Sequence, residues 1–340
     1  MTDDAPEALR AWVREDFGVD LTGAEAVGHG ADRHARLWQA RSADGTRYAV
    51  KLSGGGSPAG LVVSAYLGAR GVPGIAVPLR TRDGRLWSDR DGRRLSLVPW
   101  VSDARALGGA MTAEHWRAYG ELLAAVHDVA VTDDLAALLP PGGAAHAAIV
   151  AAARGVDARL RGLRPGDQGD PLVDELARIW SGARGTVAAL ARGVERLGDE
   201  LRDRPGPAVV CHGDPHLGNL LLGPEGRVWL IDWDDAVLAP RECDLMFLIG
   251  GVLAFAPVTA AQQAAAFAGY GRVDVDATRL AWFLSVRALD DIGDWSRQVL
   301  DAASAEADRR QALDIVRGLV SPHGLVTLAD AALADLARQR

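Results

Sequence analysis

The spacing of apolar and polar positions changes character about one third of the way along the chain. Residues 6–18 have the apolar repeat of a short amphipathic helix. From residue 24 to residue 100 the chain reads as a series of short β-rich segments, interrupted by one helix over roughly 58–70. After residue 102 the chain is mostly Ala-rich with helical spacing, except for paired short strands around 207–232. The pattern predicts an α+β protein with a small β-rich lobe followed by a larger helical lobe.

Short turn signals separate the strand-like segments of the first third. An Asp-Gly pair between two such segments is a hairpin signal, because glycine and aspartate tolerate the positive φ that tight hairpin turns need. The pairs are Asp44-Gly45, Asp83-Gly84 and Asp91-Gly92.

The apolar segment Leu97–Val101 is the predicted crossing between the two lobes. We expect an N-terminal lobe at residues 1–97, a hinge at 98–101, and a C-terminal lobe at 102–340.

The paired strands around 207–232 enclose the strongest candidate for a catalytic loop. His212-Gly-Asp-Pro-His-Leu-Gly-Asn219 places an Asp and an Asn five residues apart, and Ile231-Asp-Trp-Asp234 ends the next short strand. Protein kinases use this spacing: the Asp faces the attacking hydroxyl, the Asn holds a Mg²⁺, and a further Asp at a strand end binds Mg²⁺ across the phosphates. The alternative is a loop with polar caps, but the spacing favours a kinase of small molecules.

Lysine usage supports the same interpretation independently. Of the 37 Lys and Arg residues, Lys51 is the only lysine. A site that keeps Lys in such an Arg-rich chain is expected to need a compact ammonium instead of a planar guanidinium. Lys51 lies in Arg47-Tyr-Ala-Val-Lys-Leu-Ser53, which resembles the kinase strand whose Lys holds the α- and β-phosphates. A single Lys preceded by Val50 also excludes a Gly-Lys-Ser/Thr phosphate loop.

Length and charge narrow the class of partner. A chain of 340 residues with 49% hydrophobic content is long enough for two lobes with packed cores. The formal net charge is −8, and residues 101–340 carry all of the excess negative charge. An acidic surface argues against nucleic acid and favours a cationic partner.

Cysteine usage and the N-terminus point to the cytoplasm. The two cysteines, Cys211 and Cys243, stand in apolar segments and are expected to be core residues in a reducing compartment. Met1-Thr-Asp-Asp-Ala5 begins acidic, unlike a signal peptide, and the longest apolar run, residues 245–257, is too short to span a bilayer.

Taken together, these motifs resemble the aminoglycoside phosphotransferase family, which has a bilobal protein-kinase-like fold. The resemblance covers residues 20–250 and rests mainly on the two acidic motifs, with Lys51 and Leu122-Leu-x-x-Val-His127 as support. Within the family, Leu95–Val101 and the late helix Trp282–Ile292 look most like the spectinomycin phosphotransferase branch.

The resemblance implies a role for each matching residue. Asp214 resembles the catalytic base, and Asn219 and Asp232 resemble the Mg²⁺ ligands. Asp234 is a supporting anchor within reach of the substrate or a plain exposed acid.

Three further segments extend the predicted site. Gly28 and Gly30, in Val27-Gly-His-Gly-Ala-Asp32, resemble a shortened phosphate-covering loop, with a plain β-turn as the alternative. The carbonyl of Val98 and the amide of Trp100 are expected to meet adenine, since Pro99 has no N–H. On a helix over 280–300, spacing places four charged residues on one broad face, either against the substrate or as a solvated face with internal ion pairs. They are Arg287, Asp290, Asp291 and Asp294.

One departure from the kinase pattern stands out. Kinases pair the strand Lys with a Glu on the following helix, but no Asp or Glu occurs between Lys51 and Asp83. Lys51 must find another partner, for which Asp232 and the phosphates alone are the options.

The expected reaction is transfer of the γ-phosphoryl group of ATP or GTP, with Mg²⁺, to a hydroxyl of a small cationic molecule. An aminocyclitol or aminoglycoside antibiotic is the first choice, with resistance or self-protection as the role. Nucleoside antibiotics, homoserine, choline and sugar amines are alternatives, as is a catalytically inactive nucleotide-binding module. A protein kinase is disfavoured because no Ala-Pro-Glu segment follows the acidic strand. We expect a monomer or homodimer with no nucleic-acid or membrane partner.

Overall fold

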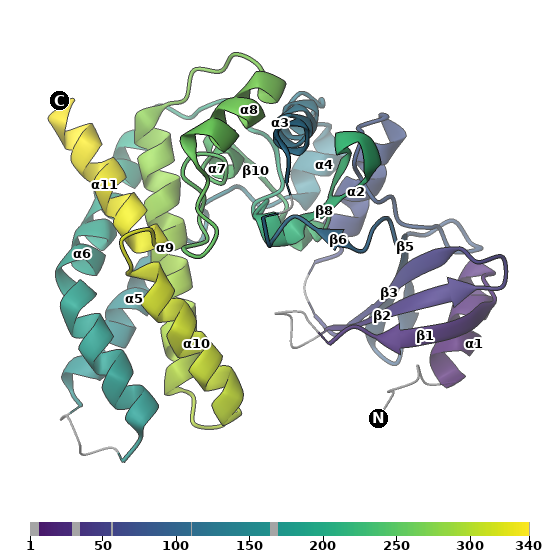
Figure 1. Cartoon of the computed structure of the whole chain (residues 1–340), viewed down its shortest axis with the longest axis horizontal. Coiled ribbons are helices and arrows are strands. Elements are labelled where there is room, and N and C mark those ends of the chain that lie inside the picture. The colour runs from purple at the N-terminus through teal and green to yellow at the C-terminus, as the bar shows by residue number, and fades with distance from the viewer. Residues whose placement is uncertain (1–6, 29–34, 56, 110, 164–168, 340) are drawn as a thin grey trace. The chain divides into compact units, whose positions relative to one another are not determined.

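The computed structural model describes residues 7–28, 35–55, 57–109, 111–163 and 169–339, and Figure 1 shows the order of its elements. The chain forms two compact units, each built from separated stretches of sequence. Unit 1 comprises residues 1–139 and 212–236, and unit 2 comprises residues 140–211 and 237–340. The loop and acidic motif of the predicted site therefore both fold into the unit that contains Lys51.

Unit 1 contains the antiparallel sheet that the first third of the sequence predicts. Five strands follow the order β1-β2-β3-β5-β4, and every neighbouring pair is antiparallel. The hairpin between β2 and β3 turns at Gly45, whose φ of 87° suits glycine, while the Asp44 carboxylate accepts a hydrogen bond from the Thr46 amide. The strands are β1 (Leu21–Ala26), β2 (Ala35–Ser42), β3 (Arg47–Ser53), β4 (Ser88–Arg90) and β5 (Arg93–Pro99).

A small apolar core lies between α1 and the sheet of unit 1. Leu9 and Val13 of α1 (Glu7–Phe17) belong to the same buried cluster as Trp38, Val50 and Leu97 of the sheet. Burying these side chains stabilises the sheet by roughly 1.5–3 kcal/mol each. The other helices of unit 1 are α2 (Ala59–Ala69), α3 (Ala113–His127) and α4 (Asp133–Leu138).

A second, three-stranded sheet of unit 1 carries the motif region. It has the order β6-β8-β9, and β8 pairs antiparallel with both neighbours. Its strands are β6 (Ala104–Arg105), β8 (Leu220–Leu222) and β9 (Val228–Leu230). Three short 3₁₀ turns belong to this region: η1 (Leu217–Asn219), η2 (Pro224–Gly226) and η3 (Trp233–Asp235).

Unit 2 is a helical bundle with one short two-stranded sheet. The long helix α9 (Ala277–Leu300) packs against α5, α6, α10 and α11, as Figure 1 also shows. α6 (Pro171–Arg202) starts at the N-cap Asp170, whose carboxylate accepts hydrogen bonds from the Leu172 and Val173 amides. The remaining elements are α5 (His146–Arg161), β7 (Val209–Cys211), β10 (Val237–Ala239), α7 (Glu242–Leu245), α8 (Ala260–Tyr270), α10 (Glu306–Leu319) and α11 (Leu325–Arg338).

The α+β class and the order of a β-rich part followed by a helical part are confirmed. Both cysteines are buried in unit 2, as expected for core residues. The lobe boundaries of 1–97, 98–101 and 102–340 stay predictions.

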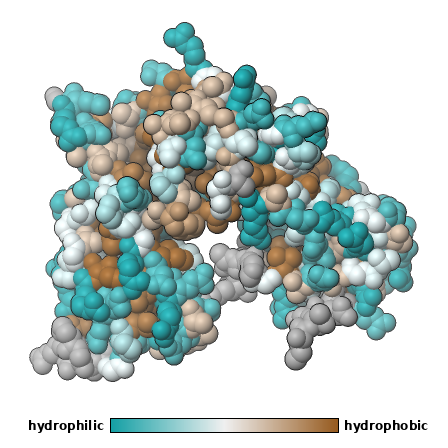
Figure 2. All heavy atoms as spheres, in the orientation of Figure 1, coloured by the Kyte–Doolittle hydropathy of each residue, from teal (hydrophilic) through white to brown (hydrophobic). Residues whose placement is uncertain are grey.

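Apolar side chains are mostly withdrawn from the surface. Among the described residues, the exposed large hydrophobics are Val77, Val131 and Phe255. In Figure 2, hydrophilic residues cover most of the visible face around the N-terminal sheet. None of the helices in the described ranges combines the length and the hydropathy needed to span a bilayer.

Candidate active site

A buried histidine joins the predicted catalytic loop to the acidic turn. The loop starts where β7 ends, and the side chain of His212 is fully buried. Its Nε2 lies 2.9 Å from the Ile231 carbonyl oxygen, and its Nδ1 accepts a hydrogen bond of 3.2 Å from the Asp214 amide. An imidazole that accepts at Nδ1 and donates at Nε2 is neutral. Both ring nitrogens of His212 therefore bond to backbone groups, and this side chain holds the loop in its geometry.

The loop holds Asp214 and Asn219 in a fixed relation. The Asn219 side-chain amide donates a 2.9 Å hydrogen bond from Nδ2 to the Asp214 carbonyl, which leaves Oδ1 as the atom able to ligate a cation. His216 caps η1 by accepting from the Gly218 amide at 2.9 Å, and its Nε2 lies 3.5 Å from the Asp214 carboxylate. The Asp214 side chain is only 14% exposed.

The acidic turn follows β9 and presents two carboxylates. Asp232 adopts the left-handed conformation with φ 63° and ψ 64°, which is unusual for a residue with a side chain. Trp233 is buried beneath the turn and donates from Nε1 to the Leu230 carbonyl at 3.0 Å. The Ile231 amide donates to the Asn219 carbonyl at 3.0 Å, so the residue before Asp232 is hydrogen-bonded to Asn219.

Lys51 reaches the acidic turn from the middle of β3. Its Nζ lies 2.6 Å from Asp234 Oδ2 and 3.5 Å from Asp232 Oδ1. The structure therefore brings together side chains that are more than 180 residues apart in the sequence. Asp232, the carboxylate partner expected from the sequence, is the more distant of the two, and the nearer carboxylate belongs to Asp234.

These oxygen donors suit a hard divalent cation. Mg²⁺ takes oxygen ligands and is held in kinases by a few carboxylate or amide oxygens plus phosphates. The Asp232 carboxylate and Asn219 Oδ1 provide such a set, and Lys51 supplies a compact positive charge beside it.

The backbone direction at the predicted hinge corrects one expectation. The Trp100 amide donates to the Arg47 carbonyl at 2.9 Å, and Val98 pairs with Ala49 in the same antiparallel ladder. Alternate residues of a ladder direct their N–H and C=O to the same side, so the Val98 carbonyl also faces β3. The Val98 carbonyl and the Trp100 amide therefore both face β3 and not a nucleotide on the opposite side of β5. The expected adenine contacts were wrong by one residue along the strand.

The glycine-rich segment is only partly described. Gly28 follows β1, and a Cβ added there would meet no atom of the described residues within 4 Å. Gly30 lies outside the described residues, as does the rest of the segment from residue 29 to residue 34.

The charged face predicted on the late helix lies on α9 in unit 2. Arg287 pairs with Asp291 at 2.9 Å, and Asp294 pairs with Arg297. Among the described residues, the Asp290 carboxylate has no hydrogen-bond or ion-pair partner, although the charges of Arg287 and Arg297 act on it. Burial, with the nearby charges of Asp294 and Asp291, raises the pKa of Asp290 to about 6.

Comparison with known proteins decides the family. The family model described as "Phosphotransferase enzyme family" matches residues 25–283. The chain belongs to this family. It is therefore an enzyme that transfers phosphoryl groups to small molecules, and the matched range contains Lys51, the loop and the acidic turn.

Solved structures show the shared fold. Spectinomycin phosphotransferase APH(9)-Ia, solved with ADP and spectinomycin, matches with a TM-score of 0.85 and 24% identity over 96% of this chain and 98% of that one. Macrolide 2'-phosphotransferase MphH from Brachybacterium faecium matches with a TM-score of 0.55 and 20% identity, over 93% and 98% of the two chains. Amicoumacin kinase hAmiN, solved with AMP-PNP, Ca²⁺ and Ami, matches with a TM-score of 0.57 and 15% identity over 86% of each chain.

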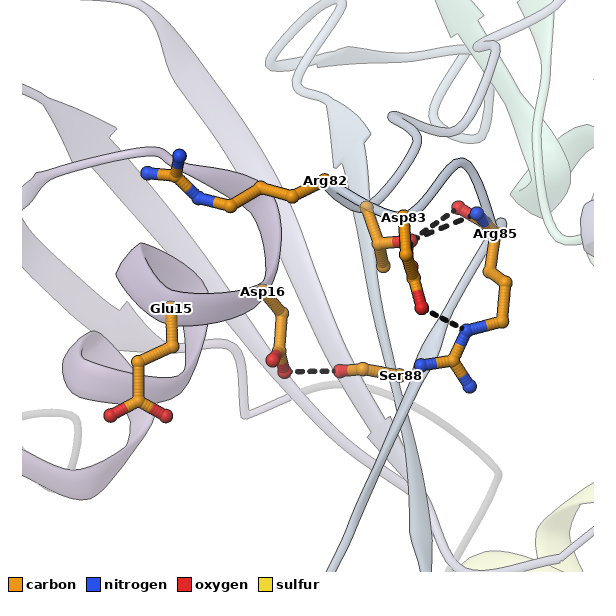
Figure 3. Close-up of a pocket in the computed structure, with 7 residues that line it drawn as sticks. Glu15, Asp16, Arg82, Asp83, Arg85 and Ser88 are labelled. Carbon is orange, nitrogen blue, oxygen red and sulfur yellow. Dashed lines mark hydrogen bonds and ion pairs between the residues drawn. The ribbon is translucent and has the colours of Figure 1, made fainter.

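A separate cavity in unit 1 of this phosphotransferase contains none of the predicted site residues. It measures about 210 Å³ and is lined by α1 and the segment around residues 81–88 (Figure 3). Its polar groups bond to one another: Ser88 donates to Asp16, and Arg85 donates to Asp83 at 2.8 Å. The Arg90 guanidinium donates to Asp16 and lowers the pKa of that carboxyl. Because Asp16 is on α1 and Arg90 is on β4, these bonds hold α1 against the sheet.

Two further tertiary contacts, which the sequence did not indicate, hold the phosphotransferase site. The Tyr119 hydroxyl donates from α3 to the Pro215 carbonyl within the catalytic loop. Gly60, at the first turn of α2, lies directly against Trp233 and Asp234. Neither residue carries a local signal, because each acts through a tertiary contact.

The loop geometry generates a prediction at Gly213. Its φ is 84°, and a Cβ there would lie 2.2 Å from the Asp235 carbonyl oxygen. Gly213→Ala should therefore displace Asp214 and lower kcat by about a hundredfold, because errors near 1 Å are that costly. Steady-state assays on the folded variant measure this. As a control, Gly155→Ala, on α5 with open space around it, should keep wild-type turnover. A Gly213→Ala enzyme with normal kcat would contradict the placement of Asp214.

Proposed function

We propose that this phosphotransferase moves the γ-phosphoryl group of ATP or GTP to a hydroxyl of a small cationic molecule. The observation that carries the proposal is the convergence of Lys51, the Asp214–Asn219 loop and the Asp232 turn within one unit. Family membership supplies the phosphotransferase activity, and this arrangement supports the kinase chemistry.

Asp214 is the proposed base. Its carboxylate orients the acceptor hydroxyl and accepts its proton while the oxygen bonds to the γ-phosphorus and the bond to the leaving nucleotide breaks. His216, 3.5 Å away, and the Asn219 side chain, bonded to the Asp214 carbonyl, hold the carboxylate in position. Positioning of this kind supplies most of the catalysis, because the phosphoryl transition state is loose.

Lys51, Asn219 and Asp232 are the proposed triphosphate-binding residues. The Lys51 ammonium would face the α- and β-phosphates, and Asn219 Oδ1 and the Asp232 carboxylate would hold Mg²⁺. Bound there, Mg²⁺ would neutralise negative charge on the phosphates. The solved relatives with ADP or with AMP-PNP and Ca²⁺ support this assignment.

The adenine contacts are proposed one residue further along than expected. The ladder that directs Val98 and Trp100 toward β3 turns the Pro99 carbonyl and the Val101 amide to the opposite side. A carbonyl and an amide two residues apart match the acceptor–donor edge of a purine.

With this hinge at 98–101, the lobes would divide at residues 97 and 102. The glycines Gly28 and Gly30 are proposed to lie over the phosphates.

The proposed acceptor is an aminocyclitol or aminoglycoside antibiotic, with resistance or self-protection as the biological role. The similarity to a spectinomycin phosphotransferase and the acidic character of residues 101–340 support it. On α9, Asp291 and Asp294 each pair with an Arg of the same helix, whereas Asp290 does not. Asp290 is therefore the proposed anchor for a substrate ammonium, with Arg287 and its partners around it.

Other acceptors fit the same chemistry. Nucleoside antibiotics, homoserine, choline and sugar amines each offer a hydroxyl near a cation. A panel of these compounds beside aminocyclitols and aminoglycosides, with nucleotide diphosphate release as the signal, tests the acceptor directly. An inactive nucleotide-binding module would show no acceptor-stimulated release, and its main support, the missing helix Glu, is weakened by the Lys51–Asp234 pair. The enzyme is proposed to act in the cytoplasm as a monomer or homodimer.

The first test of the proposed function is Asp214→Asn. This change keeps shape but removes the base, so kcat should fall by about 10²–10⁴-fold while the Kd for ATP stays within about threefold. Turnover and calorimetric ATP binding on one preparation measure both. The exposed acid Asp89 provides a charge-matched control, since Asp89→Asn should leave both values unchanged. Activity within tenfold of wild type would remove Asp214 from the mechanism.

The second test concerns the proposed metal ligands. Asn219→Ala and Asp232→Ala should raise the Mg²⁺ concentration for half-maximal turnover by about tenfold or more, with a smaller change in acceptor KM. A Mg²⁺ titration at saturating ATP and acceptor measures the shift. Glu225→Gln, in the turn between β8 and β9, is the control within the same hairpin. An unchanged Mg²⁺ requirement in both variants would argue against the assignment.

The third test uses the raised pKa of Asp290. Between pH 3.8 and about 6, the Asp290 carboxyl keeps its proton in the folded protein but loses it in the unfolded chain. The contribution of Asp290 to stability therefore falls as pH rises through that window. Asp290→Asn should gain stability relative to wild type between pH 4 and pH 7, by at most about 2 kcal/mol because the side chain is partly exposed.

The same variant tests the substrate role of Asp290. For a cationic acceptor, KM should rise by about tenfold or more at pH 7.5, since a charged partner is lost, while kcat changes little. Asp330→Asn, on the exposed face of α11, should change neither stability nor KM. An unchanged KM together with the predicted stability gain would show that Asp290 is a partly buried acid that does not contact the substrate.

A further inference from the structure

The helix that follows the lysine strand cannot supply a carboxylate. α2 has the sequence Ala-Gly-Leu-Val-Val-Ser-Ala-Tyr-Leu-Gly-Ala, and residues 52–82 contain no Asp or Glu. The Lys51 side chain is only 27% exposed, and an ammonium withdrawn from water needs a carboxylate or equivalent partner.

The acidic turn supplies that carboxylate from the other side of the site. Asp234 Oδ2 lies 2.6 Å from the Lys51 Nζ, within the range of a charge-assisted hydrogen bond. Asp232 Oδ1 is 0.9 Å further away, at 3.5 Å. The two carboxylates therefore differ: Asp234 bonds the lysine, and Asp232 is left for the cation site.

The packing of α2 explains why the turn and not the helix occupies this position. A Cβ on Gly60 would lie 2.8 Å from the Trp233 carbonyl and 2.9 Å from Asp234 Oδ1. One helical turn later, the buried Ser64 hydroxyl donates to the Gly60 carbonyl at 2.8 Å. This face of α2 is thus in close contact with the turn, which removes the space that a long acidic side chain would need.

The turn itself is held firmly. The Trp233 side chain is anchored to the Leu230 carbonyl, and the Ala236 amide closes the 3₁₀ turn on the Trp233 carbonyl at 3.0 Å. One rigid turn therefore presents both the lysine partner and the proposed metal ligand.

We propose that Asp234 is the positioning residue of Lys51, in place of a helix glutamate. This inference rests on the proposed function, in which Lys51 binds the nucleotide phosphates. Kinases control their Lys–Glu pair by moving the helix. Here the pair is built into the turn that carries Asp232, so its formation needs no helix movement.

The test compares Asp234→Asn and Asp234→Glu with wild type. Asp234→Asn should lower kcat by about a hundredfold, because the ammonium is misplaced, and should weaken binding of ADP without Mg²⁺ by at least threefold. Asp234→Glu keeps the charge and should restore at least a tenth of wild-type kcat. Asp89→Asn controls for loss of an exposed negative charge.

A double-mutant cycle separates positioning from a direct role. If Asp234 acts through Lys51, then Asp234→Asn added to Lys51→Met should change kcat and ADP affinity by less than threefold. Lys51→Arg should resemble Asp234→Asn, because a forked guanidinium cannot take the same place between the turn and the phosphates. Fully additive losses, or a raised Mg²⁺ requirement in Asp234→Asn, would show that Asp234 binds metal or substrate directly and would overturn the proposal.

Gly60→Ala provides an independent variant that leaves both charges in place. It should displace the turn and reproduce the kcat loss of Asp234→Asn, whereas Gly155→Ala should not. Thermal melting identifies variants that fail to fold, and the Asp234 series keeps the test valid in that case.

Failure of the proposed function has a different signature. If no acceptor supports turnover, the ADP-binding cycle without Mg²⁺ still tests the Lys51–Asp234 coupling. Unchanged ADP affinity and kcat in Asp234→Asn would overturn the positioning role while leaving the kinase assignment intact.

Discussion

The contact between the Lys51 ammonium and the Asp234 carboxylate joins the two parts of unit 1 that carry the chemistry. Lys51 comes from the central strand of the five-stranded sheet, and Asp234 comes from a 3₁₀ turn after the β8–β9 hairpin. A partly buried ammonium without a carboxylate would carry a desolvation cost, so the sheet and the turn must meet at this distance. The absence of an acid on α2 and the close approach at Gly60 are consistent with that single constraint.

The catalytic loop depends on backbone hydrogen bonds more than on ion pairs. His212 bridges the Ile231 carbonyl and the Asp214 amide, and the Asn219 carbonyl accepts from the Ile231 amide. These contacts are short-ranged and directional, which suits a loop that must hold a carboxylate and an amide in fixed relation. A neutral His212 follows from the same pattern, because its Nδ1 must accept.

Unit 2 is stabilised by a different kind of interaction. Its buried core is apolar, and Asp290 is a partly buried acid with a raised pKa on a helix whose neighbouring acids are paired. When burial and nearby like charges raise the pKa of a carboxyl group, a cation that binds beside it strongly stabilises the charged form. That property links the negative charge of residues 101–340 to the cationic acceptor proposed for this enzyme.

Much of this protein could be predicted from the sequence, because the signals involved are local. Hairpin turns, helical periodicity and the spacing of Asp214, Asn219 and Asp232 are properties of short segments, and the single lysine is a property of composition. Tertiary structure decided the rest. Strand register turned the Val98 and Trp100 groups toward β3, since a shift of one residue reverses the direction of every backbone group. The partner of Lys51 was decided by the packing of α2 against the acidic turn. The two residues lie 183 positions apart, and only folding brings their charges within hydrogen-bonding distance.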